Sequence, residues 1–170
     1  MKDNHFQSEF IQQSILRMTE SSERIKICLD QITEQQVWQK PNSQTNSIGN
    51  LILHLCGNIT QYAIASLGNK EDHRERDLEF STTDGFSKDE LWKKIKATAN
   101  LAIDTINKTP QSELLRTRNV QGFELTGIGI IIHVVEHYSY HTGQIALWTK
   151  LLVDKDLGFY ADMDLNIRSV

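Results

Sequence analysis

Apolar residues recur at the spacing of a helix face in four separate stretches of the chain. The first stretch runs from about Phe6 to Gln31, where apolar side chains follow a repeated four-three spacing. This spacing places them on one side of an α-helix and leaves most polar residues on the other side. The stripe consists of Ile11, Ile15, Met18, Ile25, Leu29 and Ile32, with Ser22 among them. The pattern therefore predicts a long amphipathic helix over these residues.

The second and third stretches carry helix start and stop signals as well as apolar stripes. The second begins at Ser47, a favourable N-cap, and ends near Gly68, a typical helix stop. The third follows Ser87, which is spaced from Glu90 as in a capping box, and ends at Pro110. The two stripes are Ile48, Leu51, Ile52, Leu55, Ile59 and Tyr62, and then Leu91, Ile95, Ala99, Ala102 and Ile106.

The fourth stretch predicts a helix from the N-cap Thr126 to Val153. Its apolar face is formed by Ile130, Val134, Ile145, Trp148 and Leu152. Gly143 lies deep inside this helix, where glycine costs about 1 kcal/mol relative to alanine. We expect a neighbouring helix to approach closely at this position.

The segments between these helices are polar and are predicted to be loops. They cover Glu34 to Asn46, Asn69 to Gly85 and Glu113 to Leu125; the run Arg118 to Phe123 could form a turn or a short hairpin and is kept as loop. Four amphipathic helices of about 20 to 28 residues bury their stripes most economically in a bundle. We therefore predict an all-α, single-domain four-helix bundle over residues 1–170, with long loops between its second and third and its third and fourth helices.

Charge and hydropathy exclude two classes of partner. The net charge is −4 and no run rich in Lys and Arg occurs, so we expect no nucleic-acid partner. The segment Lys70 to Glu79 carries both signs and is predicted to be a solvated loop or helix end. The longest apolar stretch, Ile128 to Val135, is far shorter than the roughly 20 residues of a membrane span.

The first residues, MKDNHFQSEF, do not have the pattern of a secretory signal, and we expect a cytoplasmic protein. In a reducing compartment, Cys28 and Cys56 are expected to be two buried free thiols.

Histidines supply the candidate chemistry. His137 and His141 fall within the apolar face of the fourth helix, one turn apart, while His133 lies on its flank. Two histidines at this spacing can converge on one cation, as in zinc enzymes. Either protein groups or a metal must satisfy such buried rings. A third ligand would be needed, and His54, on the shoulder of the second stripe, can reach the same interior.

Two segments resemble signatures of the DinB/YfiT-like superfamily. They are Ile48 to Leu55 (IGNLILHL) and Ile132 to Ile145 (IHVVEHYSYHTGQI). The resemblance implies a four-helix bundle with an unusual helix order, a homodimer, and one divalent metal ion on His54, His137 and His141. His133 matches a frequent position that is not a ligand. Thr142 departs from the arginine often found at this position in the family.

The resemblance also implies an activity. Three neutral imidazoles leave open positions on the metal, and zinc or nickel is expected. Family members include S-transferases that use low-molecular-weight bacterial thiols, so the expected partners are such a thiol and a small-molecule electrophile, with a hydrolase as a related possibility. Candidates for supporting roles are Asn58, Glu136, Tyr138, Tyr140 and Gln144. Asn58 and Gln144 could orient a ligand, Glu136 is expected at the surface, and the two tyrosines are expected in packing or at an interface.

Two alternatives stay open at the level of sequence. One is a non-catalytic metal-binding or stress-response bundle that acts through dimerisation. The other is a plain helical interaction bundle, whose core histidines are hydrogen-bonded and hold no metal.

Overall fold

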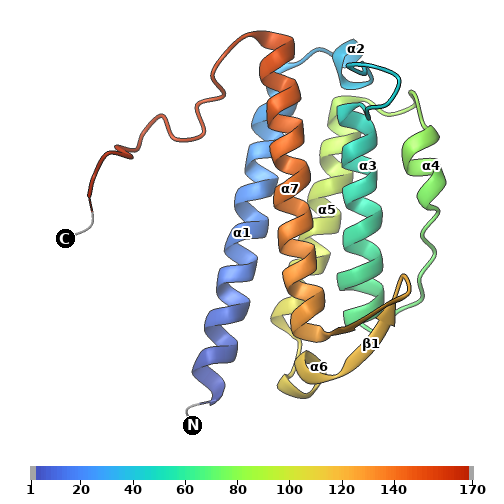
Figure 1. Ribbon diagram of the computed structural model, residues 1–170, viewed down its shortest axis with the longest axis vertical. Coiled ribbons are helices and arrows are strands. Elements are labelled where there is room, and N and C mark those ends of the chain that lie inside the picture. Colours follow the sequence, from blue (N-terminus) through green and yellow to red (C-terminus); the bar gives the residue numbers. More distant parts are fainter. Residues whose placement is uncertain (1–2, 169–170) are drawn as a thin grey trace.

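Four long helices form a bundle in the computed structural model, which describes residues 3–168 (Figure 1). They are α1 (Asp3–Gln31), α3 (Ile48–Ile59) with its continuation η1 (Thr60–Leu67), α5 (Lys88–Asn107) and α7 (Gly127–Val153). The connections hold α2 (Glu34–Val37), α4 (Arg76–Ser81), α6 (Gln111–Leu115) and the strands β1 (Thr117–Val120) and β2 (Phe123–Thr126). The predicted all-α bundle is confirmed, and residues 1, 2, 169 and 170 lie outside the described part.

The order of the helices around the bundle follows from which helices pack together. Among the four long helices, α1 packs mainly against α5 and α7, and α3 also packs against α5 and α7. In Figure 1, α3 and α5 run in the same direction, opposite to α1 and α7. Two parallel neighbours need a long connection, and residues 68–87 supply it by running back along the outside of α3. This return segment, which includes α4, is thereby placed against α3.

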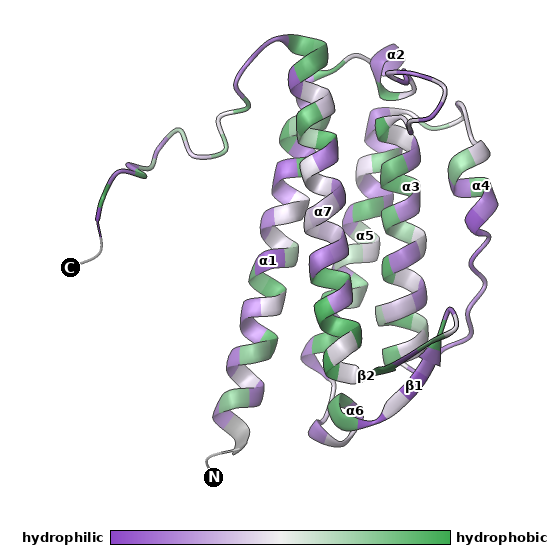
Figure 2. Ribbon diagram, in the orientation of Figure 1, coloured by the Kyte–Doolittle hydropathy of each residue, from purple (hydrophilic) through white to green (hydrophobic). Residues whose placement is uncertain are grey.

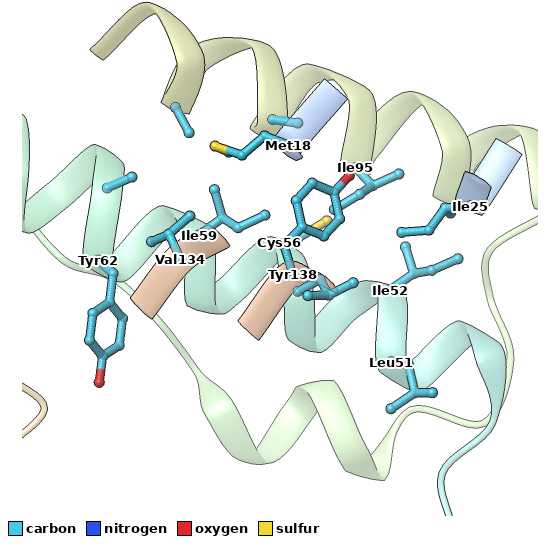
Figure 3. Close-up of a cluster of buried hydrophobic side chains, with 14 of the residues drawn as sticks. Met18, Ile25, Leu51, Ile52, Cys56, Ile59, Tyr62, Ile95, Val134 and Tyr138 are labelled. Atoms are coloured by element: carbon cyan, nitrogen blue, oxygen red, sulfur yellow. The ribbon is translucent and has the colours of Figure 1, made fainter. Parts of the chain in front are cut away.

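The predicted apolar stripes meet in the core. Every member of the second and third stripes is buried, as are most members of the first and fourth. Hydrophobic and hydrophilic segments alternate along each long helix (Figure 2), and the buried hydrophobic residues form the core. Figure 3 shows side chains from all four helices in one cluster: Met18 and Ile25 from α1, Ile52 and Cys56 from α3, Ile95 from α5, and Val134 and Tyr138 from α7. The fold thus rests on the hydrophobic periodicity of the sequence.

The predicted helix starts are confirmed in detail. Ser47 and Ser87 each accept a hydrogen bond from the backbone N–H three residues later, and the side chain of that residue returns to the cap backbone. Thr126 caps α7 by accepting from the N–H of Gly129. Each such cap contributes about 1 kcal/mol, so these helix boundaries are set locally.

Four features differ from the predictions. The segments predicted to be loops also contain the short helices α2, α4 and α6. The stretch kept as loop contains a hairpin, in which Gln121 and Gly122 form a two-residue turn with φ values of 54° and 84°. Positive φ at both positions suits the right-handed twist of the flanking strands. The second helix widens into the π-helix η1 from Thr60 onward. The expectation that a neighbouring helix approaches closely at Gly143 is wrong, because a Cβ there would meet no atom within 4 Å.

Two further expectations concern the cysteine thiols and membrane-spanning helices. Cys28 and Cys56 are both buried and free, as predicted. Across residues 3–168, every helix is too short or too polar to cross a bilayer.

Candidate metal centre

The three histidines assigned from sequence come together between α3 and α7. His54 is buried at 7% exposure, whereas His137 and His141 are partly buried. The rings of all three lie edge to face, with centroids 5.0 Å apart for His54 and His137, 4.9 Å for His54 and His141, and 4.5 Å for His137 and His141. Two helices that are distant in sequence therefore present three imidazoles to one point.

The nitrogens of these rings are close enough to hold one metal ion. One ligand nitrogen from each ring lies within 4.8 Å of the other two, and Nε2 of His54 is 3.0 Å from Nε2 of His137. Two nitrogens that are each about 2.0–2.1 Å from one zinc ion are at most about 4.2 Å apart. At tetrahedral angles the two nitrogens would lie about 3.4 Å apart, so a pair separated by 4.8 Å would have to close by roughly 1.4 Å through side-chain rotation to share one ion.

A buried carboxylate fixes the orientation of His54. Nδ1 of His54 lies 2.9 Å from Oε2 of Glu79, and Arg74 binds both oxygens of Glu79, with Nε 2.7 Å from Oε1 and Nη2 2.9 Å from Oε2. Nη2 of Arg74 is also 3.2 Å from Nδ1 of His54. Since a carboxylate can only accept, the proton sits on Nδ1, and the lone pair of Nε2 faces the other two histidines.

His141 is oriented in the same way by Gln144. Oε1 of Gln144 lies 2.7 Å from Nδ1 of His141 and accepts a hydrogen bond from its N–H. The lone pair of Nε2 is then free toward the centre. The supporting role predicted for Gln144 thus has a structural counterpart. Glu136 is exposed, as expected, and Tyr140 is 62% exposed with its ring against His141. Tyr138 is a packing residue, fully buried, and its hydroxyl lies 2.8 Å from that of Ser22.

His133 and Asn58 form a second polar layer one helical turn from the three histidines. Nδ2 of Asn58 lies 3.2 Å from Nε2 of His133, whose ring stacks between those of Tyr62 and His137. Asn58 therefore contacts His133 and not one of the three candidate ligands. Its Oδ1 is buried without a hydrogen-bond partner among the described residues. This polar layer therefore contains one buried acceptor whose hydrogen-bonding capacity is not used within the described residues.

Comparison with known proteins places this arrangement in a family. Residues 5–161 match the family described as "Protein of unknown function (DUF1572)". The chain belongs to this family. The histidines and their partners are therefore features of a DUF1572 chain, whose matched region includes all four long helices except the first residues of α1. No curated protein matches the chain.

Solved structures share the fold of this DUF1572 chain. A conserved protein from Enterococcus faecalis is 15% identical, with a TM-score of 0.74, over 85% of this chain and 97% of that one. A DinB-like protein, YjoA, from Bacillus subtilis is also 15% identical, with a TM-score of 0.64, over 82% of this chain and 91% of that one. At 15% identity these structures show the fold, and the bundle fold implied by the resemblance to the DinB/YfiT-like superfamily is thus confirmed.

Electrostatics favour the neutral form of His137 and His141 in this DUF1572 chain. Burial lowers the pKa of His137 from 6.5 to about 3, and repulsion from His141 and His54 acts in the same direction. Burial also lowers the pKa of His141, although its hydrogen bond with Gln144 opposes the shift. Burial alone would raise the pKa of Glu79, but its hydrogen bonds with Arg74 and His54 bring it below its ordinary value. Neutral imidazoles are the form that binds metal ions.

Glu79 and Arg74 are the site residues that the sequence did not reveal. The segment Lys70 to Glu79 was predicted to be solvated, and this holds for Glu71 and His73, whose side chains are 88% and 80% exposed. It is wrong for Arg74 and Glu79, whose side chains are 3% and 9% exposed. Their burial depends on the return path of the chain along α3, and no local sequence pattern predicts that path.

A cavity of about 480 Å³ lies on the other side of this ion pair. Its walls come from α3, α5 and the return segment, and they include Leu53, Gly57, Arg74, Glu79 and Lys94. None of the three histidines lines it. Arg74 and Glu79 therefore separate the cavity from the candidate metal centre.

Proposed function

We propose that this protein binds one divalent metal ion, zinc or nickel, on His54, His137 and His141. The observation that carries the proposal is the convergence of three imidazole nitrogens. In His54 and His141, the other ring nitrogen is held by a hydrogen-bond acceptor. A ring oriented in this way points its lone pair at the ion before the ion arrives. The mainly neutral nitrogen donor set suits zinc or nickel better than magnesium or calcium, which prefer oxygen ligands.

We further propose that the bound metal serves catalysis, as a thiol S-transferase or a related hydrolase. A metal with only three protein ligands supplies Lewis acidity, which promotes the loss of a proton from a thiol or water at an open position. Within the chain, Glu79 and Gln144 hold two rings in place. His133 and Asn58 provide polar atoms one turn away, of which Oδ1 of Asn58 has no partner in the described part. Free, buried Cys28 and Cys56 support action in the reducing cytoplasm.

A second candidate is a metal-binding module without catalysis. The position of the large cavity favours this reading, since it is lined by Arg74 and Glu79 and by none of the histidines. A catalytic centre needs space for a substrate beside the metal. In a non-catalytic module, the ion would stabilise the bundle and its contacts with partners.

Elemental analysis of untagged protein, purified without chelators, tests metal binding. We expect about one equivalent of zinc or nickel per chain. Incubation of the metal-loaded protein with a low-molecular-weight bacterial thiol and an electrophilic aryl halide then tests transfer, with the metal-free protein as the control. Metal without turnover supports the non-catalytic module, whereas trace metal alone contradicts both candidates.

We also propose that the protein forms a homodimer through the outer face of α7. Ile132, Tyr140, Leu147 and Leu151 are 52–67% exposed and fall, with Gly143, within an arc of about 100° on the helix. Gly143 faces open space, so a second copy of α7 can approach closely at that point. Analytical ultracentrifugation should give a dimer for the wild type and a monomer for Leu147→Glu. The variant Leu101→Glu, at an exposed position on α5, is the matched control and should stay dimeric.

A further inference from the structure

We infer that Glu79, clamped by Arg74, is a positioning residue of the metal centre, so that the return segment along α3 is part of that centre. This inference rests on the proposed metal binding by His54. A carboxylate and a guanidinium that are both at least nine-tenths buried are costly to keep outside water unless each is fully paired. Here Arg74 contacts both oxygens of the Glu79 carboxylate, and the other side-chain partner of that carboxylate is His54.

The geometry gives Glu79 a specific task. Arg74 binds one oxygen through Nε and the other through Nη2, which fixes the plane of the carboxylate. Oε2 then meets Nδ1 of His54 at 2.9 Å. The carboxylate accepts a hydrogen bond from Nδ1–H. This bond holds the ring in place and makes Nε2 a stronger electron-pair donor to a metal. Arg74 acts through Glu79, and its Nη1 is held in turn by Oε1 of Gln61.

Gly57 on α3 provides the space for this pair. A Cβ at Gly57 would lie 1.8 Å from Oε1 of Glu79 and 2.9 Å from Nε of Arg74. Any side chain at this position would therefore displace the carboxylate from His54. Glycine at position 57 thus leaves room for the carboxylate that contacts His54, one helical turn earlier on α3.

Asn50 ties the backbone of the same segment to α3. Its Nδ2 donates to the carbonyl oxygens of Glu79 and Thr82, at 3.0 and 2.6 Å. Its Oδ1 accepts from the backbone N–H of Ser47 within the helix cap. The segment is therefore docked both through its backbone and through the carboxylate on His54. By linkage, metal binding and docking of the segment strengthen each other.

Two variants test this coupling against a matched control. Glu79→Gln keeps the size of the side chain and removes its charge, while Gly57→Ala displaces the carboxylate without altering it. Zinc affinity, measured by competition with a chromophoric chelator, should fall roughly 10- to 100-fold in Glu79→Gln and at least as far in Gly57→Ala. Glu136→Gln removes an exposed carboxylate next to His137 in sequence and should stay within about twofold of wild type.

A spectroscopic readout separates positioning from general destabilisation. At saturating cobalt(II), the visible absorption bands of Glu79→Gln should be shifted, because the altered hydrogen bond at Nδ1 changes the donor strength of His54. Hydrogen exchange of residues 71–82 should slow when zinc binds to the wild type. If the wild type binds zinc and Glu79→Gln matches it in affinity and spectrum, the inference is overturned while metal binding stands. If the wild type binds no zinc, both fail.

Discussion

Replacing His137 with alanine is expected to reduce the bound metal from about one ion per chain to a trace, because only two protein ligands remain. His137 is central to the arrangement, with its Nε2 3.0 Å from that of His54 and its ring 4.5 Å from that of His141. The loss of affinity should exceed the roughly 10- to 100-fold expected for a partner outside the coordination sphere. Elemental analysis and zinc titration of the purified variant give the measurement.

His133→Ala is the matched control for that variant. His133 lies one turn earlier on the same helix, is also partly buried, and stacks on His137 at 5.2 Å without joining the three converging rings. It should retain about one metal ion per chain. Equal, trace metal in the wild type and in both variants would contradict the metal site and leave an ordinary helical bundle with hydrogen-bonded histidines. Circular dichroism establishes that both variants are folded.

Acidification is expected to destabilise the metal-free protein strongly. In the unfolded chain His137 takes up a proton near its ordinary pKa of 6.5, whereas burial and neighbouring rings hold its pKa in the folded protein at about 3. Between these values the unfolded state binds more protons, so the free energy of unfolding falls as the pH falls. The slope is about 1.4 kcal/mol per pH unit for each proton taken up, and solvent screening of this partly buried ring reduces it. The lowered pKa values of His133 and His141 act in the same direction.

Urea titrations of the metal-free protein between pH 7 and pH 4 measure this effect. His137→Gln replaces the ring with a polar side chain that does not titrate, and its stability should depend less on pH over the same range. An identical pH dependence in the two proteins would show that the ring does not account for the acid sensitivity. Excess chelator in every sample keeps metal release out of the comparison.

Local sequence patterns were sufficient to predict the helical bundle and the inward position of two of the three histidines. Helix stripes and caps are local patterns, and the same wheel that predicted the core placed His137 and His141 on the inner face of α7. The family motifs then added His54, which the wheel allowed without requiring. The side-chain rotations that bring one nitrogen of each ring within 4.8 Å of the other two depend on three-dimensional packing.

The partners of these histidines could not be predicted because they depend on a return path. Arg74 and Glu79 lie in a run of charged residues without periodicity, where most side chains are solvated. Their burial follows from the parallel arrangement of α3 and α5, which forces the connection back along α3. The gap at Gly57 that receives them has no meaning until that connection is in place. Likewise, the hairpin turn at Gln121 and Gly122 contained only one glycine as a signal.

The separation of His54 and His137 by 83 residues has a consequence for biosynthesis. During translation, a nascent chain exposes the first ring long before α7, which supplies the other two, has left the ribosome. A fragment that ends before α7 lacks two of the three converging rings and should therefore bind zinc much more weakly than the whole chain. Metal uptake would then mark the completed chain, and a purified fraction that lacks metal would report on maturation as well as on affinity.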